Sequence, residues 1–176
     1  MFAASASTCS AKFFHLLHSN FHFPIMTIFL PIRVVAFETD FAGVVSNTRY
    51  LEYMERGRYA MLQAANLKVT EMLAQHGVQP IVRRVEMDYL IPARHEDDLI
   101  LRIESGEFKR SSFTLEYELT RPSDGAVLMR ALHTMAFINE RWRAVRVPEW
   151  FRHTFSAQAA QVLAEVEQSK SQSKNT

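Results

Sequence analysis

The residues best suited to chemistry lie in one loop, residues 40–47 (DFAGVVSN), directly before the longest helical pattern of the chain. The first backbone N–H groups of a helix have no intrahelical acceptor and lie at the positive end of the helix dipole, so they can stabilise an oxyanion. Asp40 places a carboxylate beside those donors, where it could act on an acyl group as nucleophile or general base. Gly43 permits close approach of the backbone to a substrate. Residue types alone leave a second interpretation open, in which Asp40 is only a turn or capping residue.

Length and composition exclude several other classes of protein. The chain has 176 residues, of which 48% are hydrophobic and 22% charged, and its formal net charge is +1. These values are typical of one globular domain and give no electrostatic footprint for nucleic acid. The sequence contains no glycine-rich dinucleotide motif, P-loop or G-x-S-x-G elbow. Its single cysteine, Cys9, excludes an internal disulfide and a cysteine-based metal site.

The two ends of the chain differ from its middle. Six of the 13 phenylalanines fall within the first 30 residues, in a region with no helix or strand period. We predict that residues 1–26 are a disordered leader or a segment translated from upstream of the native start, with Met26 as the candidate start, and that residues 27–164 form the domain. Residues 165–176 are polar and predicted to be a flexible tail. The leader histidines lack the period and the carboxylates expected of a metal site, and no stretch approaches the length of a membrane span.

The positions that could do chemistry must be held by a helix that starts near Thr48. Small and apolar residues recur there at spacings of three and four, whereas Glu52 and Arg56 lie on the other face as a favourable pair. Asn47 or Thr48 is the expected N-cap. A glycine within a helix costs about 1 kcal/mol relative to alanine, so Gly57 indicates close packing against a sheet. Asn66 is expected to end this helix, and a short second helix is predicted over residues 70–76.

Strand patterns occupy most of the remaining chain. Residues 27–37 are predicted to form a strand, which Pro31 either places at a sheet edge or interrupts. Alternating apolar residues predict strands after Pro80, with the cleanest at 113–119 and a central one at 126–139, which is apolar on both faces. A last helix is predicted to begin at Pro148, with these residues inward: Trp150, Phe151, Phe155, Ala159 and Val162. This order predicts an α+β fold, an antiparallel sheet wrapped around one long helix.

The motif D-x-x-G-V-V-x-N-x-x-Y-L-E-Y-x-E-x-G-R, from Asp40 to Arg58, resembles the signature of the hotdog-fold acyl-CoA thioesterases. The most similar subgroup contains 4-hydroxybenzoyl-CoA thioesterase and the Tol-Pal-associated acyl-CoA thioesterases. The resemblance covers residues 28–155 and includes D-Y-x-x-P-A-R from Asp88 and D-D-L from Asp97. It implies the hotdog fold, sheets paired edge to edge in a homodimer or homotetramer, and active sites at the dimer interface.

The resemblance also implies roles for individual residues. Asp40 corresponds to the catalytic aspartate, which attacks the thioester carbonyl or activates water, and the backbone N–H of Asn47 to the group that polarises that carbonyl. Substrate-binding positions are expected at Phe41, Gly43, Val44, Tyr50, Tyr53 and Met54. Contacts with the coenzyme A phosphates are expected at Lys109, Arg110, Ser111 and Ser112, a segment that from its residues alone reads equally well as a solvated hairpin turn.

Departures from the family pattern leave the acyl group open. Asn47 stands where the Tol-Pal-associated members have histidine and the hydroxybenzoyl enzyme has tyrosine, and Ala36 stands where the former have tyrosine; an asparagine is similar to the long-chain members. We therefore predict hydrolysis of an aromatic or fatty acyl-CoA. The alternatives are a non-catalytic acyl-CoA-binding module and an acyl carrier protein thioesterase.

Other candidate sites have simpler explanations. Glu52 and Glu55 correspond to carboxylates that some fold relatives use, but a charged helix face accounts for both. His133 is expected to be a satisfied core or interface histidine, and residues 95–98 (HEDD) a solvated connection rather than a cation site. The predicted enzyme needs no metal and no cofactor, since coenzyme A is part of the substrate. It is expected to be cytoplasmic, without nucleic-acid partners.

Overall fold

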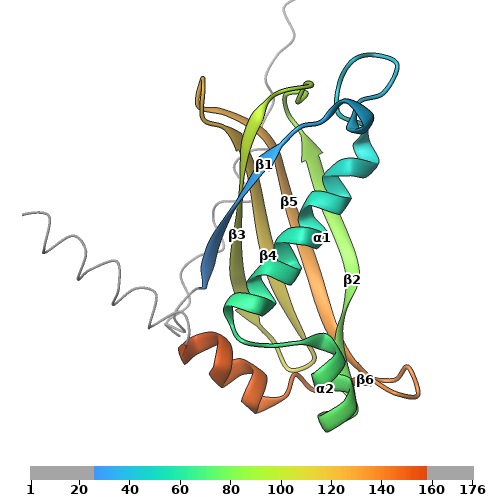
Figure 1. Ribbon diagram of the computed structural model, residues 1–176. Coiled ribbons are helices and arrows are strands. Elements are labelled where there is room, and N and C mark those ends of the chain that lie inside the picture. Colours follow the sequence, from blue (N-terminus) through green and yellow to red (C-terminus); the bar gives the residue numbers. More distant parts are fainter. Residues whose placement is uncertain (1–25, 158–176) are drawn as a thin grey trace, which may run out of the picture.

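The computed structural model describes residues 26–157, which form one sheet around one long helix (Figure 1). The predicted tail and most of the predicted leader lie outside the described residues, as do Ala159 and Val162. The elements in chain order are β1 (Thr27–Arg33), the 3-10 turn η1 (Ala36–Glu38), α1 (Asn47–Ala64), α2 (Val69–His76), β2 (Val78–Tyr89), β3 (Asp98–Phe108), β4 (Ser112–Arg121), β5 (Ala126–Asn139) and β6 (Ala144–Val145). Residues 149–157 are helical.

The sheet is antiparallel, with the strand order β1-β3-β4-β5-β2 and the short β6 paired with β5. Both prolines within strands lie on the edges: Pro31 in β1 and Pro80 in β2, where the missing N–H breaks no internal ladder. The strand that is apolar on both faces, β5, lies between β4 and β2, which confirms its predicted central place. The predicted α+β class is confirmed.

Helix α1 lies across the concave face of the sheet and packs on β1 and β3 (Figure 1). Gly57 makes this approach possible, because a Cβ atom there would lie 2.8 Å from Cδ1 of Ile103 and 3.0 Å from Cδ2 of Leu101. The predicted packing reason for a glycine within the helix is therefore confirmed.

Five phenylalanines pack together where the last helix meets the sheet. Phe151 and Phe155, from the last helix, lie within 4.7 Å of each other between ring centroids. Phe151 also lies 4.8 Å from Phe137, and Phe113 lies 5.2 Å from Phe108. We call these residues the aromatic cluster (Phe108, Phe113, Phe137, Phe151 and Phe155). The prediction that Phe151 and Phe155 point inward from the last helix is confirmed.

Several local boundaries differ from the sequence-based expectation. The predicted strand 27–37 ends at Arg33, because the backbone N–H of Val35 donates to the buried carboxylate of Glu38 at 2.9 Å and turns the chain into η1. The N-cap of α1 is Ser46, not Asn47 or Thr48, and its side chain makes no capping bond. Helix α1 ends at Ala64, just before Asn66, which takes a left-handed φ of 54°.

The charged face of α1 also pairs differently from the prediction. Glu52 binds Arg49, one turn earlier, at 2.6 Å rather than Arg56. Met26, the last residue of the predicted leader, is 1% exposed, and its backbone N–H donates to the hydroxyl of Ser105 at 2.9 Å. This residue is therefore part of the packed domain.

Candidate active site

The loop before α1 is a tight turn that its own backbone holds closed. Thr39 and Val45 form an isolated bridge, and the N–H of Asp40 donates to the carbonyl of Val44 at 2.9 Å. The N–H of Gly43 returns to the carbonyl of Asp40 at 3.0 Å. Gly43 has a φ of +71°, a conformation that side chains other than glycine rarely adopt. The predicted need for glycine at this position therefore has a backbone cause.

The carboxylate of Asp40 is exposed and makes one local contact. Its Oδ1 atom accepts a hydrogen bond from the backbone N–H of Ala42 at 2.8 Å, which is the contact of an Asx turn. The turn-residue interpretation is thus realised in the structure. It occupies only one of the two carboxylate oxygens, so the other can still act as a base or nucleophile.

The first two backbone N–H groups of α1 have no acceptor in the part of the chain that the structure describes. Within residues 26–157, no hydrogen bond satisfies the backbone N–H of Asn47 or Thr48, since the Ser46 side chain makes no cap. The Ser46 hydroxyl instead lies 3.3 Å from the Thr48 hydroxyl. These free donors, at the positive end of the helix dipole, are the groups that an oxyanion would need.

The carboxylate and the helix start share one open pocket of about 400 Å³. Its walls combine two segments that are far apart in the chain: the loop and first turn of α1, and the end of β2 with the residues after it. The residues that line it are Asp40, Val44, Val45, Asn47, Tyr50, Tyr89, Leu90, Ile91 and Pro92. The structure therefore brings together four of the predicted site residues: Asp40, Val44, Asn47 and Tyr50.

Two tyrosines join the two walls of the pocket. The hydroxyl of Tyr50 accepts a hydrogen bond from the N–H of Ala93 at 3.1 Å, and burial raises the pKa of Tyr50. The ring of Tyr89 packs edge-on against that of Tyr50, with centroids 5.2 Å apart. The carbonyl of Ala93 in turn accepts the N–H of Val45 at 2.9 Å. The segment after β2 is thereby fixed against the loop that holds Asp40.

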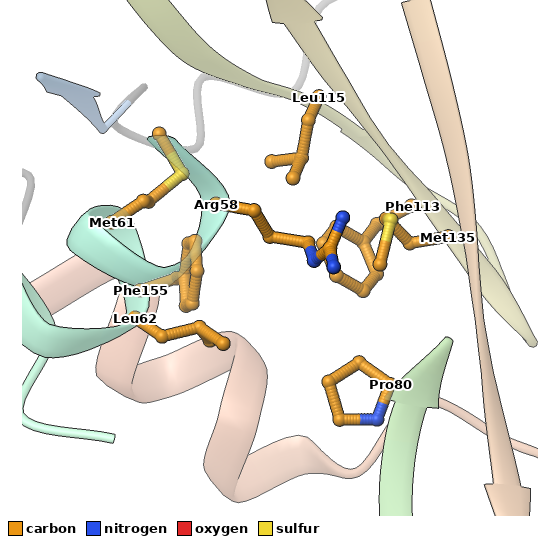
Figure 2. A pocket seen from close by; sticks show the side chains of 8 residues that line it. All are labelled: Arg58, Met61, Leu62, Pro80, Phe113, Leu115, Met135 and Phe155. Atoms are coloured by element: carbon orange, nitrogen blue, oxygen red, sulfur yellow. The ribbon is translucent and has the colours of Figure 1, made fainter. Parts of the chain in front are cut away.

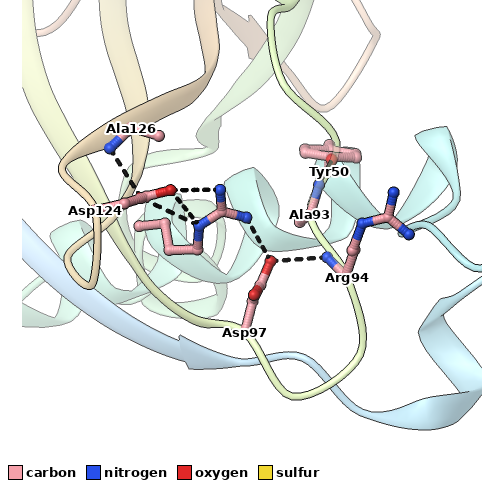
Figure 3. Close-up of polar contacts among 7 residues, drawn as sticks. Tyr50, Ala93, Arg94, Asp97, Asp124 and Ala126 are labelled. Atoms are coloured by element: carbon pink, nitrogen blue, oxygen red, sulfur yellow. Dashed lines mark hydrogen bonds and ion pairs between the residues drawn. The ribbon is translucent and has the colours of Figure 1, made fainter.

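Arginine–aspartate contacts anchor the same segment from its other side (Figure 3). The Asp97 carboxylate accepts the backbone N–H of Arg94 at 2.8 Å and the guanidinium of Arg121 at 3.0 Å. Arg121 also binds Asp124 at 2.7 Å in the β4–β5 turn. Asp98 binds Arg33 at 2.7 Å. These acids of the predicted solvated connection are therefore used in ion pairs.

Five pocket residues are absent from the predicted site: Val45, Tyr89, Leu90, Ile91 and Pro92. Val45 lies within the motif that begins at Asp40, and the signal for the other four is the D-Y-x-x-P-A-R motif at Asp88, which is part of the resemblance but carries no predicted role. Their place follows from the register of β2 on β5, which sets Tyr89 opposite Met129 and carries the chain past the helix start.

Other predicted site residues lie outside this pocket. Phe41 is fully exposed on the loop, whereas Tyr53 and Met54 are 1% and 0% exposed in the core. Burial raises the pKa of Tyr53, whose hydroxyl has no hydrogen-bond partner among the described residues. The roles of Phe41, Tyr53 and Met54 in substrate binding stay predictions.

The predicted coenzyme A segment, residues 109–112, lies at the other end of the molecule. Strand β3 begins at Asp98, opposite Arg33 and near the pocket, and extends about 33 Å to its last residue, Phe108. The N–H of Lys109 donates to the carbonyl of Ser112 at 2.7 Å, so the segment is a closed hairpin turn. Within one chain it does not meet Asp40.

Neither a cluster of metal ligands nor a membrane-spanning helix is present among the described residues. No group of three or more histidine, cysteine, aspartate or glutamate side chains in residues 26–157 is arranged to hold a metal ion. None of the helices in this part of the chain has the length and apolar character needed to span a bilayer. Cys9 and the three leader histidines, His15, His18 and His22, lie outside the described residues.

A long helix in the concave face of an antiparallel sheet, with a carboxylate beside its free N-terminus, defines a hotdog-fold thioester hydrolase. Residues 34–155 match the model of the Thioesterase-like superfamily. The chain belongs to this family. The predicted family, the hotdog fold and the assignment to enzymes that hydrolyse thioesters are thereby confirmed.

Individual relatives agree with the family. The chain is 32% identical over 91 residues to acyl-CoA thioesterase YbgC of Haemophilus influenzae, a match covering 52% of this chain and 67% of the relative. It is 22% identical over 124 residues to acyl-acyl carrier protein thioesterase ATL3 of Arabidopsis thaliana, covering 70% of this chain and 65% of that one. These matches span about two thirds of each relative's length.

A solved structure shows the same fold. The 4-hydroxybenzoyl-CoA thioesterase of Pseudomonas sp. strain CBS-3 superposes with a TM-score of 0.67 at 20% sequence identity. The match covers 73% of this chain and 98% of that enzyme.

Proposed function

We propose that this protein hydrolyses acyl-CoA thioesters to the free acid and coenzyme A. One observation carries the proposal: the Asp40 carboxylate and the unsatisfied N–H groups at the start of α1 line the same pocket. The thioester carbonyl would lie between them, with its oxygen at the N–H of Asn47 and its carbon facing Asp40. The name of the YbgC relative supports this substrate class.

Asp40 can act in two ways that lead to the same products. As a nucleophile it would form a mixed anhydride and expel the coenzyme A thiolate, after which water would cleave the anhydride and release the acid. As a general base it would take a proton from water as that water attacks the carbonyl. In both routes the N–H groups of α1 stabilise the tetrahedral oxyanion.

A single-turnover reaction in ¹⁸O-labelled water, with enzyme in excess, tests the nucleophilic route, because label on the Asp40 carboxylate establishes it. The nucleophilic route leaves the label on the Asp40 carboxylate when water attacks the enzyme side of the anhydride, and the general-base route never does. Mass spectrometry of the peptide that contains Asp40 makes the measurement. If thiol release is absent over aromatic, short-chain and long-chain acyl-CoAs, the proposed function is wrong.

The apolar part of the pocket suits an aromatic or fatty acyl group. Tyr89, Leu90 and Ile91 are 52%, 49% and 41% exposed, which is high for large apolar side chains. Such exposed apolar surface beside a polar site is typical of a binding region. The same substrate panel, measured as kcat/KM for each acyl-CoA, decides the acyl preference.

We further propose that the protein works as a homodimer joined along β2. This strand is a sheet edge, and its end continues into the pocket wall at Tyr89. An unpaired strand edge is a template for pairing with a second chain. Antiparallel pairing of two β2 strands would bring the far end of the partner's sheet toward the pocket. The predicted phosphate-binding turn at residues 109–112 of the partner could then contact coenzyme A. Light scattering gives the oligomeric state.

Two alternatives have an observation behind them. The Asx turn of Asp40 fits a module that binds acyl-CoA without turnover, and the similarity to ATL3 fits an acyl carrier protein as the acyl donor. Thiol release from matched acyl-CoA and acyl carrier protein substrates separates the three functions.

The proposal also includes a reaction that needs no metal or redox cofactor, for which full activity after chelation is the test. It further includes a cytoplasmic location, for which cell fractionation is the test.

A further inference from the structure

The concave face of the sheet contains a buried polar cluster that the proposed chemistry does not use. We call it the His133 cluster: His133, Tyr117 and Arg58. His133 and Tyr117 are each 3% exposed, and their ring centroids lie 4.6 Å apart. Neither ring nitrogen of His133, nor the hydroxyl of Tyr117, has a hydrogen-bond partner among the described residues. Since a buried polar group without a partner costs about 1–3 kcal/mol, a group that bonds to these three atoms would be stabilised there.

Arg58 extends from α1 toward the face of the sheet that carries His133 (Figure 2), and its charge lies near both His133 and Tyr117. Figure 2 shows its side chain crossing from α1 toward the sheet, where it lines a cavity of about 10 Å³ together with Leu115 and Met135. Leu115 is the cross-strand partner of His133, and Met135 follows His133 on the same face of β5. Arg58 has one ion pair, with Glu55 at 3.4 Å, and a guanidinium carries five donors. It can therefore donate to a further group.

The cluster offers mainly donors. Burial, together with the nearby charge of Arg58, lowers the pKa of His133 to about 4, so the imidazole is neutral near pH 7 and carries one N–H. Arg58 adds a positive charge and the Tyr117 hydroxyl adds a further donor. A ligand that satisfies these groups must present an acceptor oxygen.

A strip of side chains connects the cluster with the active-site pocket. Val85, Met87 and Tyr89 share the inner face of β2, because alternate residues of a strand point the same way. Val85 lies directly opposite His133, and Tyr89 lines the pocket beside Asp40. Val85 and Tyr89 are 39% and 52% exposed, and the strip covers about 13 Å of strand. This apolar strip suits an alkyl chain.

We propose that the apolar strip holds the acyl chain of the substrate and that the His133 cluster binds an oxygen near the far end of that chain, in a terminal hydroxyl or carboxylate. The proposal rests on the thioester hydrolysis proposed above and adds a substrate class to it. An unsubstituted chain end would leave the donors unsatisfied, whereas an oxygenated end satisfies them. A site built for a polar group discriminates strongly against an analogue that lacks it.

Steady-state kinetics with three matched series of acyl-CoA substrates tests the preference for an oxygenated chain end. The substrates are octanoyl-, decanoyl- and dodecanoyl-CoA, each unsubstituted, with a terminal hydroxyl, and with a terminal carboxylate. At the length that reaches the cluster, kcat/KM is expected to favour an oxygenated chain by about tenfold over the unsubstituted one. The variant Tyr117→Phe should remove most of this preference, by lowering kcat/KM for oxygenated chains and raising it for unsubstituted chains, which no longer leave the Tyr117 hydroxyl unsatisfied. Arg58→Gln should lower the carboxylate series more than the hydroxyl series.

The matched control is Tyr59→Phe, because Tyr59 is a half-exposed tyrosine of α1 outside the cluster. Its selectivity is expected to equal that of the wild type. Equal kcat/KM for oxygenated and unsubstituted chains at all three lengths overturns the proposal, as does a Tyr117→Phe variant with unchanged selectivity.

A binding measurement separates this proposal from the proposed function. Dodecanoyl-CoA and its derivatives with a terminal hydroxyl and a terminal carboxylate are added to the full-length Asp40→Asn variant, and the imidazole resonances of His133 are followed by NMR. Only the two compounds with an oxygenated chain end should shift them. Such a shift, together with no thiol release by the wild-type protein from any substrate, leaves the subsite standing and refutes the hydrolysis. No shift, or equal shifts for all three compounds, overturns the subsite whether or not the wild-type protein releases thiol.

Discussion

The hydroxyl of Tyr89 donates a hydrogen bond to the backbone carbonyl of Asn47 at 3.2 Å. Tyr89 is the last residue of β2 and Asn47 the first residue of α1, so this bond ties a sheet edge to the start of the central helix. The two residues also line the same pocket. The position of the free N–H groups of α1 therefore depends on a residue 42 positions away in the chain.

The variant Tyr89→Phe is expected to lower kcat by about three- to tenfold with a smaller change in KM, since one hydrogen bond contributes about 1 kcal/mol. The phenyl ring keeps the edge-on contact with Tyr50 and so preserves the pocket wall. Steady-state kinetics makes the measurement. A variant that changes KM alone shows instead that Tyr89 contacts the substrate without positioning the helix.

Asp40→Asn and Asp40→Ala form a matched pair. Asparagine can still accept the N–H of Ala42 and keep the Asx turn, but it supplies no carboxylate, whereas alanine loses both. Both variants should lose at least about a hundredfold in kcat. Only the alanine variant should also lose stability, by about 1 kcal/mol. Retention of activity by Asp40→Asn assigns the catalytic carboxylate elsewhere; thiol release and urea unfolding are the assays.

Gly43 and Gly125 provide a second matched pair. Both have a positive φ, +71° and +69°, and a Cβ atom added at either meets nothing within 4 Å. Alanine at each position should therefore cost about 1–2 kcal/mol of stability through backbone strain alone. Only Gly43→Ala should lower kcat/KM, because only Gly43 lies in the turn that holds Asp40. Equal activity in both variants would remove the catalytic importance of this turn.

Gly57→Ala is expected to destabilise the protein although alanine favours helix. The helix gain is about 1 kcal/mol, whereas overpacking a core costs about 1–3 kcal/mol, and the new Cβ atom would lie 2.8 Å from Ile103. Adding Ile103→Val removes the clashing Cδ1 atom and should recover part of the loss. Urea unfolding of the two single variants and the double variant tests this coupling, and simple additivity contradicts it.

His133 predicts a specific dependence of stability on pH. Its pKa falls from 6.5 to about 4 on folding, so below pH 6.5 the unfolded chain binds a proton that the folded protein does not. The free energy of unfolding therefore decreases as the pH falls from 6.5 to 4, by about 3 kcal/mol from this group. His133→Leu should lose less stability between pH 7 and pH 4.5 than the wild type. Parallel losses in urea titrations would show that the histidine is not buried in its neutral form.

Periodicity was sufficient to predict the main architecture. The helical spacing around Gly57 and the alternation in residues 113–119 each follow from one face meeting the core, and a period is visible in a single sequence. Their order then leaves few ways to assemble one helix and one antiparallel sheet. The end of β1 was missed because it depends on one contact, in which the N–H of Val35 finds the carboxylate of Glu38.

The site could be predicted only in part, for a related reason. Asp40 and Asn47 are neighbours in the chain, so a local motif contains both. Tyr89 reaches them only through the register of β2 on β5, and strand register is a long-range property. The helical pattern likewise groups Tyr50 with Tyr53 and Met54, but the direction of α1 over the sheet decides that Tyr50 lines the pocket and the other two lie in the core.

The aromatic cluster and the pocket occupy opposite ends of the same strands. The cluster ties the last helix to the ends of β3 and β5 and to the start of β4, whereas Asp40 lies near the start of β3. The rigid anchor of the fold is therefore separated from the chemistry by most of a strand's length. Substitutions that reshape the pocket wall at residues 90–92 can accumulate without loosening that anchor. The scaffold is thus suited to acquire a new acyl specificity through changes in one short connection.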